Sequence, residues 1–146
     1  STKEIGYLRN RVVDAAFVVI AYLCGPRASE IVSLKAGCVE YERHASEDGI
    51  ETFSYLRGDI HKTDEPRHLW VAPPEAVRAV EVMESLSRPP REQSGRDELF
   101  LASKGGNGIV KSPSITVLSS SAIIDRLNDK FAPFVELPFY HGQPGT

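Results

Sequence analysis

The sequence lacks a long hydrophobic run, is poor in cysteine and has no excess of positive charge. Its main apolar stretch, Ala15–Cys24, has ten residues, which is too short to span a membrane and is typical of a central core helix. The N-terminus shows no basic and apolar leader that ends in small residues, so no secretory signal is predicted. These absences favour a soluble protein of the cytoplasm.

Cysteine is scarce: Cys24 and Cys38 are the two thiols in 146 residues. Neither their number nor their spacing is that of a disulfide scaffold, and Cys24 on an apolar helix is most simply a small core residue. Adding the histidines as possible ligands produces no spacing typical of a structural zinc site. The sequence therefore predicts no metal and no cofactor.

The charge balance is slightly acidic, with a formal net charge of −3 at pH 7. Proteins that bind DNA strongly usually present a basic surface, so any DNA-binding face here must be a local patch. The chain is 41% hydrophobic and 25% charged, as in a soluble globular protein, and its length suits one domain with one core.

The hydrophobic pattern predicts an α+β fold, mainly helical with a small three-stranded antiparallel sheet. Helical spacing and helix-start signals indicate helices at about 3–24, 26–35, 74–87 and 120–134. Strand patterns bounded by turn residues occur at Cys38–Arg43, Glu51–His61 and Arg67–Val71. The whole chain is interpreted as a single unit, 1–146, with its sheet at about 38–71.

Two polar stretches carry no clear element. Ser87–Glu98 has no apolar core position, and Lys104–Val117 is rich in glycine and serine, so both are expected to be irregular. The last helix is expected to begin at the serines 119–121. Its predicted buried stripe is Ile124, Leu127, Phe131 and Phe134.

An arginine stands at the start of the second predicted helix, in the segment 25–35 (Gly-Pro-Arg-Ala-Ser-Glu-Ile-Val-Ser-Leu-Lys). Arg27 falls in the first turn, where unsatisfied N–H groups favour anions, and its planar guanidinium suits a phosphate diester. Glu30, three residues later, is expected to hold the Arg27 side chain. The alternative is an ordinary pair of surface charges.

A second polar segment, Gly58–Val71, contains two predicted strands with Lys62 where the first strand enters the turn. The ordered set of Arg-x-x-Glu, hairpin lysine, Pro-Pro-Glu at a helix start and the segment 99–106 (Leu-Phe-Leu-Ala-Ser-Lys-Gly-Gly) resembles the catalytic domain of tyrosine recombinases, the phage-type integrases. The resemblance runs from about Val12 to about Phe134.

This resemblance implies site-specific DNA recombination or integration through a phosphotyrosyl intermediate, without a metal or cofactor. Double-stranded DNA and other recombinase subunits, as a homo-oligomer on DNA, would be the partners, in a bacterial cytoplasm or nucleoid. Arg27 matches the first catalytic arginine, which grips the phosphate, and Lys62 matches the hairpin lysine that protonates the leaving 5′-oxygen. Glu30 matches the supporting acidic residue. Further candidates for contacts with DNA are Arg67, Lys35 and His61.

The chain departs from the family pattern in its C-terminal part. None of its four histidines is followed by arginine three residues later, although the family requires His-x-x-Arg, a further His or Trp, and then a nucleophilic tyrosine. Tyr140 precedes the place where that segment should occur. The resemblance therefore implies a truncated catalytic domain that is inactive alone.

Three other interpretations stay open. One is an enzyme like the type IB topoisomerases, which use similar chemistry. Another is a non-catalytic fragment that only binds DNA or a recombinase subunit. The last is a small α+β interaction domain in which Arg27 and Lys62 are incidental.

Overall fold

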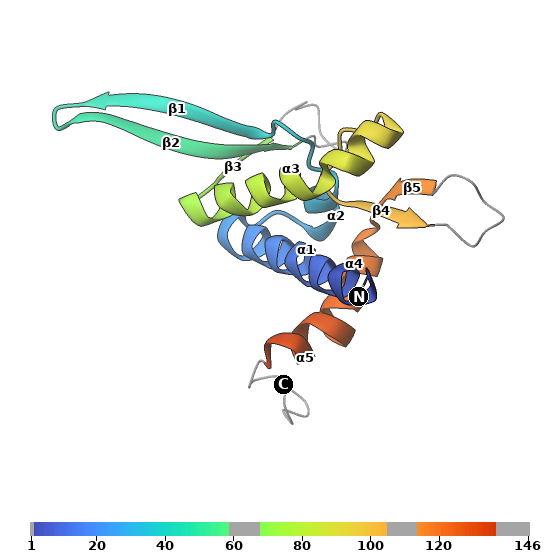
Figure 1. Cartoon of the computed structure of the whole chain (residues 1–146). Coiled ribbons are helices and arrows are strands. Elements are labelled where there is room, and N and C mark those ends of the chain that lie inside the picture. The colour runs from blue at the N-terminus through green and yellow to red at the C-terminus, as the bar shows by residue number, and fades with distance from the viewer. Residues whose placement is uncertain (1, 59–67, 105–113, 137–146) are drawn as a thin grey trace.

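The computed structural model describes residues 2–58, 68–104 and 114–136. Over these ranges the chain has an α+β fold with a three-stranded antiparallel sheet and a separate two-stranded hairpin (Figure 1). The helices are α1 (Thr2–Cys24), α2 (Ala28–Val32), α3 (Pro74–Ser94), α4 (Ser120–Arg126) and, after a π-helical turn (Leu127–Phe131), α5 (Ala132–Val135). The strands are β1 (Val39–Ser46), β2 (Gly49–Gly58), β3 (His68–Val71), β4 (Leu101–Lys104) and β5 (Ser114–Val117). The predicted α+β class and the three-stranded sheet are confirmed.

The core lies between α1 and α3, which run side by side (Figure 1). One face of α1 buries Val13, Phe17 and Ile20, and the facing side of α3 buries Val80 and Met83. Further buried side chains come from α2 and the residues after it, from β2, and from the segment before β4: Ile31, Leu34, Leu56, Leu99 and Phe100. Among the helices described, none combines the length and apolar character that a membrane span needs.

The sheet has the strand order β1–β2–β3, and its two ends differ in burial. β3 pairs only with residues 55–58 of β2, whereas β1 and β2 stay paired from Val39↔Leu56 out to Ser46↔Gly49. Residues 41–53 are exposed, so the outer part of β1–β2 is a two-stranded ribbon that projects from the body (Figure 1). β1 is therefore longer than the predicted strand, which ended at Arg43.

The third helix is longer than predicted, because α3 continues to Ser94 through Pro89 and Pro90. The expected irregular stretch 87–98 is thus wrong over residues 87–94, which are helical. Proline lacks an N–H, so Pro90 leaves the Leu86 carbonyl, four residues earlier, without its helical donor. Arg9 Nη2 donates to that oxygen over 2.9 Å. A side chain from α1 thereby stabilises the helix where the local sequence would break it.

The hairpin β4–β5 was not predicted, because the stretch 104–117 was expected to be irregular. Its strands pair in the register Leu101↔Val117 to Lys104↔Ser114. The alternation in residues 114–117 (Ser-Ile-Thr-Val) was the available signal, with the isoleucine and valine on one face. The Leu118 N–H donates to the Phe100 carbonyl at 2.8 Å, which extends the contact beyond the strand ends.

The last helix begins as predicted, since Ser119 Oγ accepts a hydrogen bond from the Ala122 N–H at 3.1 Å. The predicted buried stripe is only partly right. Ile123 is fully buried, whereas Ile124 is 42% and Phe134 47% exposed. Ile123, and not its neighbour Ile124, therefore lies on the inward face of α4. Leu127 and Phe131, both half-buried, follow Ile123 at helical intervals of four.

The two neighbouring isoleucines of α4 provide a test of which face of the helix packs against the core. We expect Ile123→Ala to lower the free energy of unfolding by about 2–5 kcal/mol, because it leaves a cavity at a fully buried position. The matched change Ile124→Ala should cost less than about 1 kcal/mol at its exposed site. Urea denaturation followed by circular dichroism measures both. A larger loss of stability for Ile124→Ala would show that Ile124, as predicted from the sequence, and not Ile123 packs against the core.

Candidate functional site

Arg27 lies at the point where the chain leaves α1 and enters α2. Gly25 ends α1 with a positive φ of 81°, and Pro26 after it is buried. Arg27 is extended (φ −70°, ψ 156°), and its carbonyl accepts from the N–H groups of Glu30 and Ile31 at 2.9 and 3.0 Å. The helix therefore begins at Ala28, two residues later than predicted, with Arg27 as its N-cap residue.

Glu30 holds the backbone of Arg27 and not its side chain. Its Oε1 accepts a hydrogen bond from the Arg27 backbone N–H at 2.8 Å, as in the acidic half of a capping box. The Arg27 side chain is exposed, and its guanidinium makes no ion pair or hydrogen bond with any residue that the structure describes. The arrangement presents a charged group to solvent from a fixed backbone position.

The chain after α2 is fixed by contacts that the sequence did not suggest. The Leu99 N–H donates to the Leu34 carbonyl at 2.9 Å, and the Ala36 N–H donates to the Asp97 carbonyl at 2.8 Å. Between them Lys35 forms an antiparallel bridge with Glu98. Lys35 is exposed on this short ladder. The predicted helical end at residue 35 is wrong: α2 ends at Val32, and these pairings join residues 34–36 to residues 97–99.

The connection between β2 and β3 contains three of the predicted site residues. His61, Lys62 and Arg67 lie outside the residues that the structure describes, so their distances to Arg27 stay predictions. The strands that flank them are placed, with Gly58 opposite His68. The Trp70 ring covers the Cα of Gly58 so closely that any side chain at position 58 would strike it. This contact fixes the base of the connection.

Neither cysteine provides a reactive centre. Cys38, directly before β1, is buried, and this burial raises the pKa of its thiol to about 11, with the Glu84 carboxylate adding to the rise. Burial also raises the pKa of the Cys24 thiol. Both thiols are therefore protonated at neutral pH and poor nucleophiles. In the described part of the chain, His, Cys, Asp and Glu side chains form no group of three or more that could hold a metal ion.

A second charged cluster, which the sequence analysis missed, joins α1 to α4. Asp14 is fully buried and pairs through Oδ2 with Arg11 Nη2 at 2.9 Å. Its Oδ1 accepts from Arg126 Nη2 at 2.6 Å and from Arg126 Nε at 2.8 Å. The available signal was a single acidic residue among the apolar residues 12–20 of α1. An isolated acid in such a stretch requires a buried partner.

Comparisons with protein-family models, with curated proteins and with solved structures gave no match to this chain. A functional assignment therefore has to be argued from the residues and their geometry.

The different roles of Glu30 and Arg27 can be separated by stability measurements. We expect Glu30→Ala to lower the free energy of unfolding by about 1 kcal/mol, because the Arg27 N–H loses its acceptor. Arg27→Ala should change it by less than about 0.5 kcal/mol, since the guanidinium has no partner among the described residues. Thermal unfolding and urea titration provide both values. A loss for Arg27→Ala as large as that for Glu30→Ala would indicate a structural role for the guanidinium.

Proposed function

We propose that this chain is part of a tyrosine-recombinase catalytic domain and that Arg27 binds a phosphate of duplex DNA. The observation that carries the proposal is the exposed guanidinium of Arg27, which has no partner among the described residues and stands on a backbone fixed by Glu30. A guanidinium can give two parallel hydrogen bonds to the non-bridging oxygens of a phosphate diester. A fixed starting point reduces the conformational entropy that such a contact costs.

The second part of the proposal concerns Lys62 as the general acid that protonates the departing 5′-oxygen. A lysine is protonated at neutral pH and its flexible side chain can follow a leaving group. Support comes from the antiparallel pairing of β2 with β3, because this pairing makes the segment that contains Lys62 the connection between the two strands. His61, Arg67 and Lys35 complete the proposed contacts with DNA.

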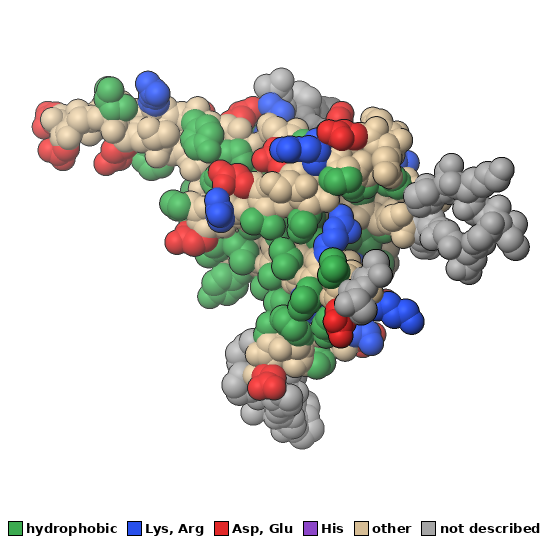
Figure 2. Space-filling model, in the orientation of Figure 1, with side chains coloured by type: hydrophobic (Ala, Val, Ile, Leu, Met, Phe, Trp, Pro, Cys, Tyr) green, Lys and Arg blue, Asp and Glu red, His purple; other side chains and the backbone are tan. Residues whose placement is uncertain are grey.

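The distribution of charge restricts where DNA can bind. Figure 2 shows acidic side chains at the free end of the ribbon, where Glu47, Asp48 and Glu51 lie. Phosphates would be repelled there, and the net charge of −3 gives no general attraction. The proposed DNA contact is therefore a small basic patch around Arg27, and affinity should be low and salt-sensitive.

A different candidate function, a protein-interaction domain, is favoured by the outer face of α1. Large apolar side chains are exposed there, among them Ile5 at 68% and Tyr22 at 86%. Contiguous exposed apolar surface is typical of sites that bind other proteins. In that case Arg27 and Lys62 would be incidental surface charges, and DNA binding would not depend on them.

DNA binding separates these two functions. We expect the chain to bind a short fluorescent duplex weakly, and Arg27→Ala to reduce the slope of log affinity against log salt by about 1, as for one lost phosphate contact. Arg27→Lys should recover the binding only in part, because an ammonium group lacks the paired donors. Lys62→Ala should weaken binding in the same assay. Fluorescence anisotropy over a salt series measures these effects.

The matched control is Arg78→Ala, which removes another exposed arginine, on α3, whose partner is Glu81. This change should leave the salt slope unaltered. Equal effects of Arg27→Ala and Arg78→Ala would mean that the affinity for DNA depends only on the total charge of the chain. The proposed phosphate site would then be wrong and the interaction domain would be favoured.

We also expect no DNA cleavage by this chain alone, because it contains no His-x-x-Arg sequence. A duplex nicked close to the scissile position traps a covalent phosphotyrosyl product, which gel electrophoresis separates from free DNA. No shifted band should form with the wild-type chain. A band that Tyr140→Phe abolishes would identify Tyr140 as the nucleophile and overturn the expectation that the chain lacks one.

A further inference from the structure

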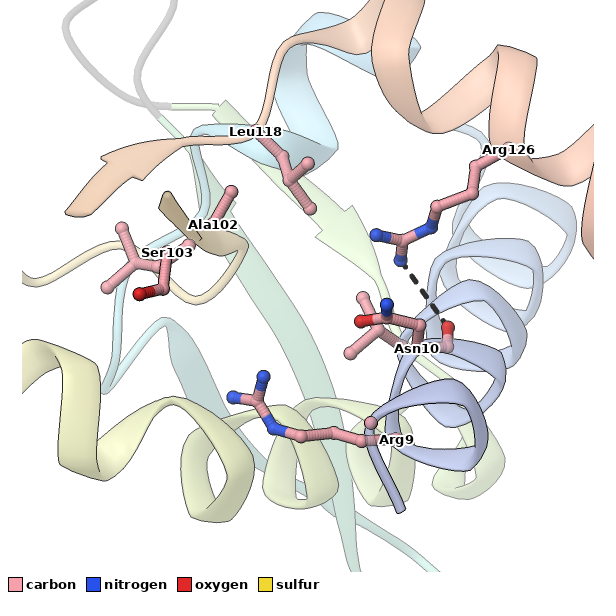
Figure 3. Close-up of a pocket in the computed structure, with 9 residues that line it drawn as sticks. Arg9, Asn10, Ala102, Ser103, Leu118 and Arg126 are labelled. Carbon is pink, nitrogen blue, oxygen red and sulfur yellow. Dashed lines mark hydrogen bonds between the residues drawn. The ribbon is translucent and has the colours of Figure 1, made fainter. Parts of the chain in front are cut away.

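A cavity of about 320 Å³ lies between the N-terminal half of α1, strand β4 and helix α4. Figure 3 shows the side chains that surround it, which come from all three elements. Its polar lining consists of Arg9, Asn10, Ser103 and Arg126, and none of the described residues that line it is acidic. The cavity is separate from the Arg27 site and plays no part in the proposed recombinase chemistry.

The two arginines of the cavity are held in place by hydrogen bonds, most of them to residues that do not line it. Arg9 donates through Nη2 to the Leu86 carbonyl at 2.9 Å. Arg126 uses Nε and Nη2 for Asp14, and Nη2 also approaches the Asn10 carbonyl at 3.4 Å. In each guanidinium Nη1 is left without a partner in these contacts. Figure 3 shows both groups pointing from opposite sides toward the same space.

Positive charge exceeds negative charge in the wall of this cavity. The Asp14 carboxylate is shared between Arg11 and Arg126, and Arg9 adds a third guanidinium on the same side of α1 as the cavity. Arg11 does not line the cavity: it pairs with Asp14, and its guanidinium lies 4.7 Å from the centre of the Tyr7 ring. One carboxylate shared by two guanidinium groups, with Arg9 close by, leaves a net positive charge beside the cavity. A bound anion would offset this excess.

We propose that the cavity binds the oxyanion group, phosphate or carboxylate, of a small molecule. Arg9 and Arg126 would donate charge-assisted hydrogen bonds to it from two sides, and the Asn10 amide and Ser103 hydroxyl would donate further bonds. The apolar part of the lining, Val13, Leu101 and Leu118, would contact a short carbon skeleton. The volume is at the lower end of the range of about 300–1,000 Å³ for ligand sites, which restricts the ligand to a few heavy atoms beyond the anion. This inference does not rest on the proposed function.

Inorganic phosphate and acetate are the two probes for this site. Each is titrated into the wild-type chain at constant ionic strength, with sodium chloride as the balancing salt, and the melting temperature is followed. A site-bound anion stabilises the folded chain in a saturable way, whereas chloride at equal ionic strength should not. Saturation by phosphate alone assigns a phosphorylated ligand, and saturation by acetate alone assigns a carboxylated one. Either result, or both, supports the site.

Variants locate the effect. Arg9→Gln removes one guanidinium and leaves the Asp14 pairs intact. It should lower the affinity for whichever anion binds the wild-type chain, phosphate or acetate, about tenfold or more. Ser103→Leu should abolish binding by filling the cavity from β4 without removing a charge. Arg78→Gln, which removes an arginine from α3 that does not line the cavity, should leave the affinity unchanged.

The proposal is overturned if neither probe stabilises the wild-type chain more than chloride does. It is also overturned if Arg9→Gln and Arg78→Gln reduce the stabilisation by the anion equally, because anion binding would then depend only on general surface charge. The wild-type titration decides the first point even where a variant fails to fold.

Discussion

The buried carboxylate of Asp14 is the interaction on which the arrangement of α1 and α4 depends. It joins residues 112 positions apart, through Arg126, and it does so with no solvent contact of its own. Removing one partner of such a pair typically costs about 3–5 kcal/mol, because the remaining charge stays buried. The pair joins α4 to α1 beside the cavity, which Arg126 also lines together with residues of β4.

The sequence predicted those elements whose signals are local. The length of α1 and the three-stranded sheet follow from periodicity and from turn residues such as those at 47–49. The extension of α3 past Pro90 could not be predicted, because it depends on a donor from Arg9, more than seventy positions away in the chain. The inward face of the last helix was misassigned by one residue, because periodicity alone does not choose between the neighbours Ile123 and Ile124, and packing against the core selects Ile123.

In the candidate site, too, local features could be predicted from the sequence and long-range contacts could not. Arg27 was predicted close to a helix start, because proline and glycine before it are strong local signals, but it is the N-cap residue and not a residue of the first turn. The role of Glu30 could not be read from spacing, since an acid three residues on can reach either the side chain or the backbone N–H, and here it reaches the N–H. The ladder between residues 34–36 and 97–99 could not be predicted, because it joins segments far apart in the sequence. Asp14 was detectable as an acid in an apolar stretch, but its partner Arg126 was not.

The projecting ribbon of β1 and β2 has a consequence for how copies of this chain meet in solution. Past the end of β3, both edges of the ribbon have no strand partner among the described residues, and such edges can accept a strand from another molecule. Charged side chains follow one another along it, with Glu42 and Arg43 on one strand and Glu51 on the other. An incoming strand would have to desolvate these charges, so the ribbon resists edge-to-edge aggregation despite its length. The same lack of neighbours makes its outer amides the first in the sheet to exchange with solvent, while those beside Leu56 stay protected by the core.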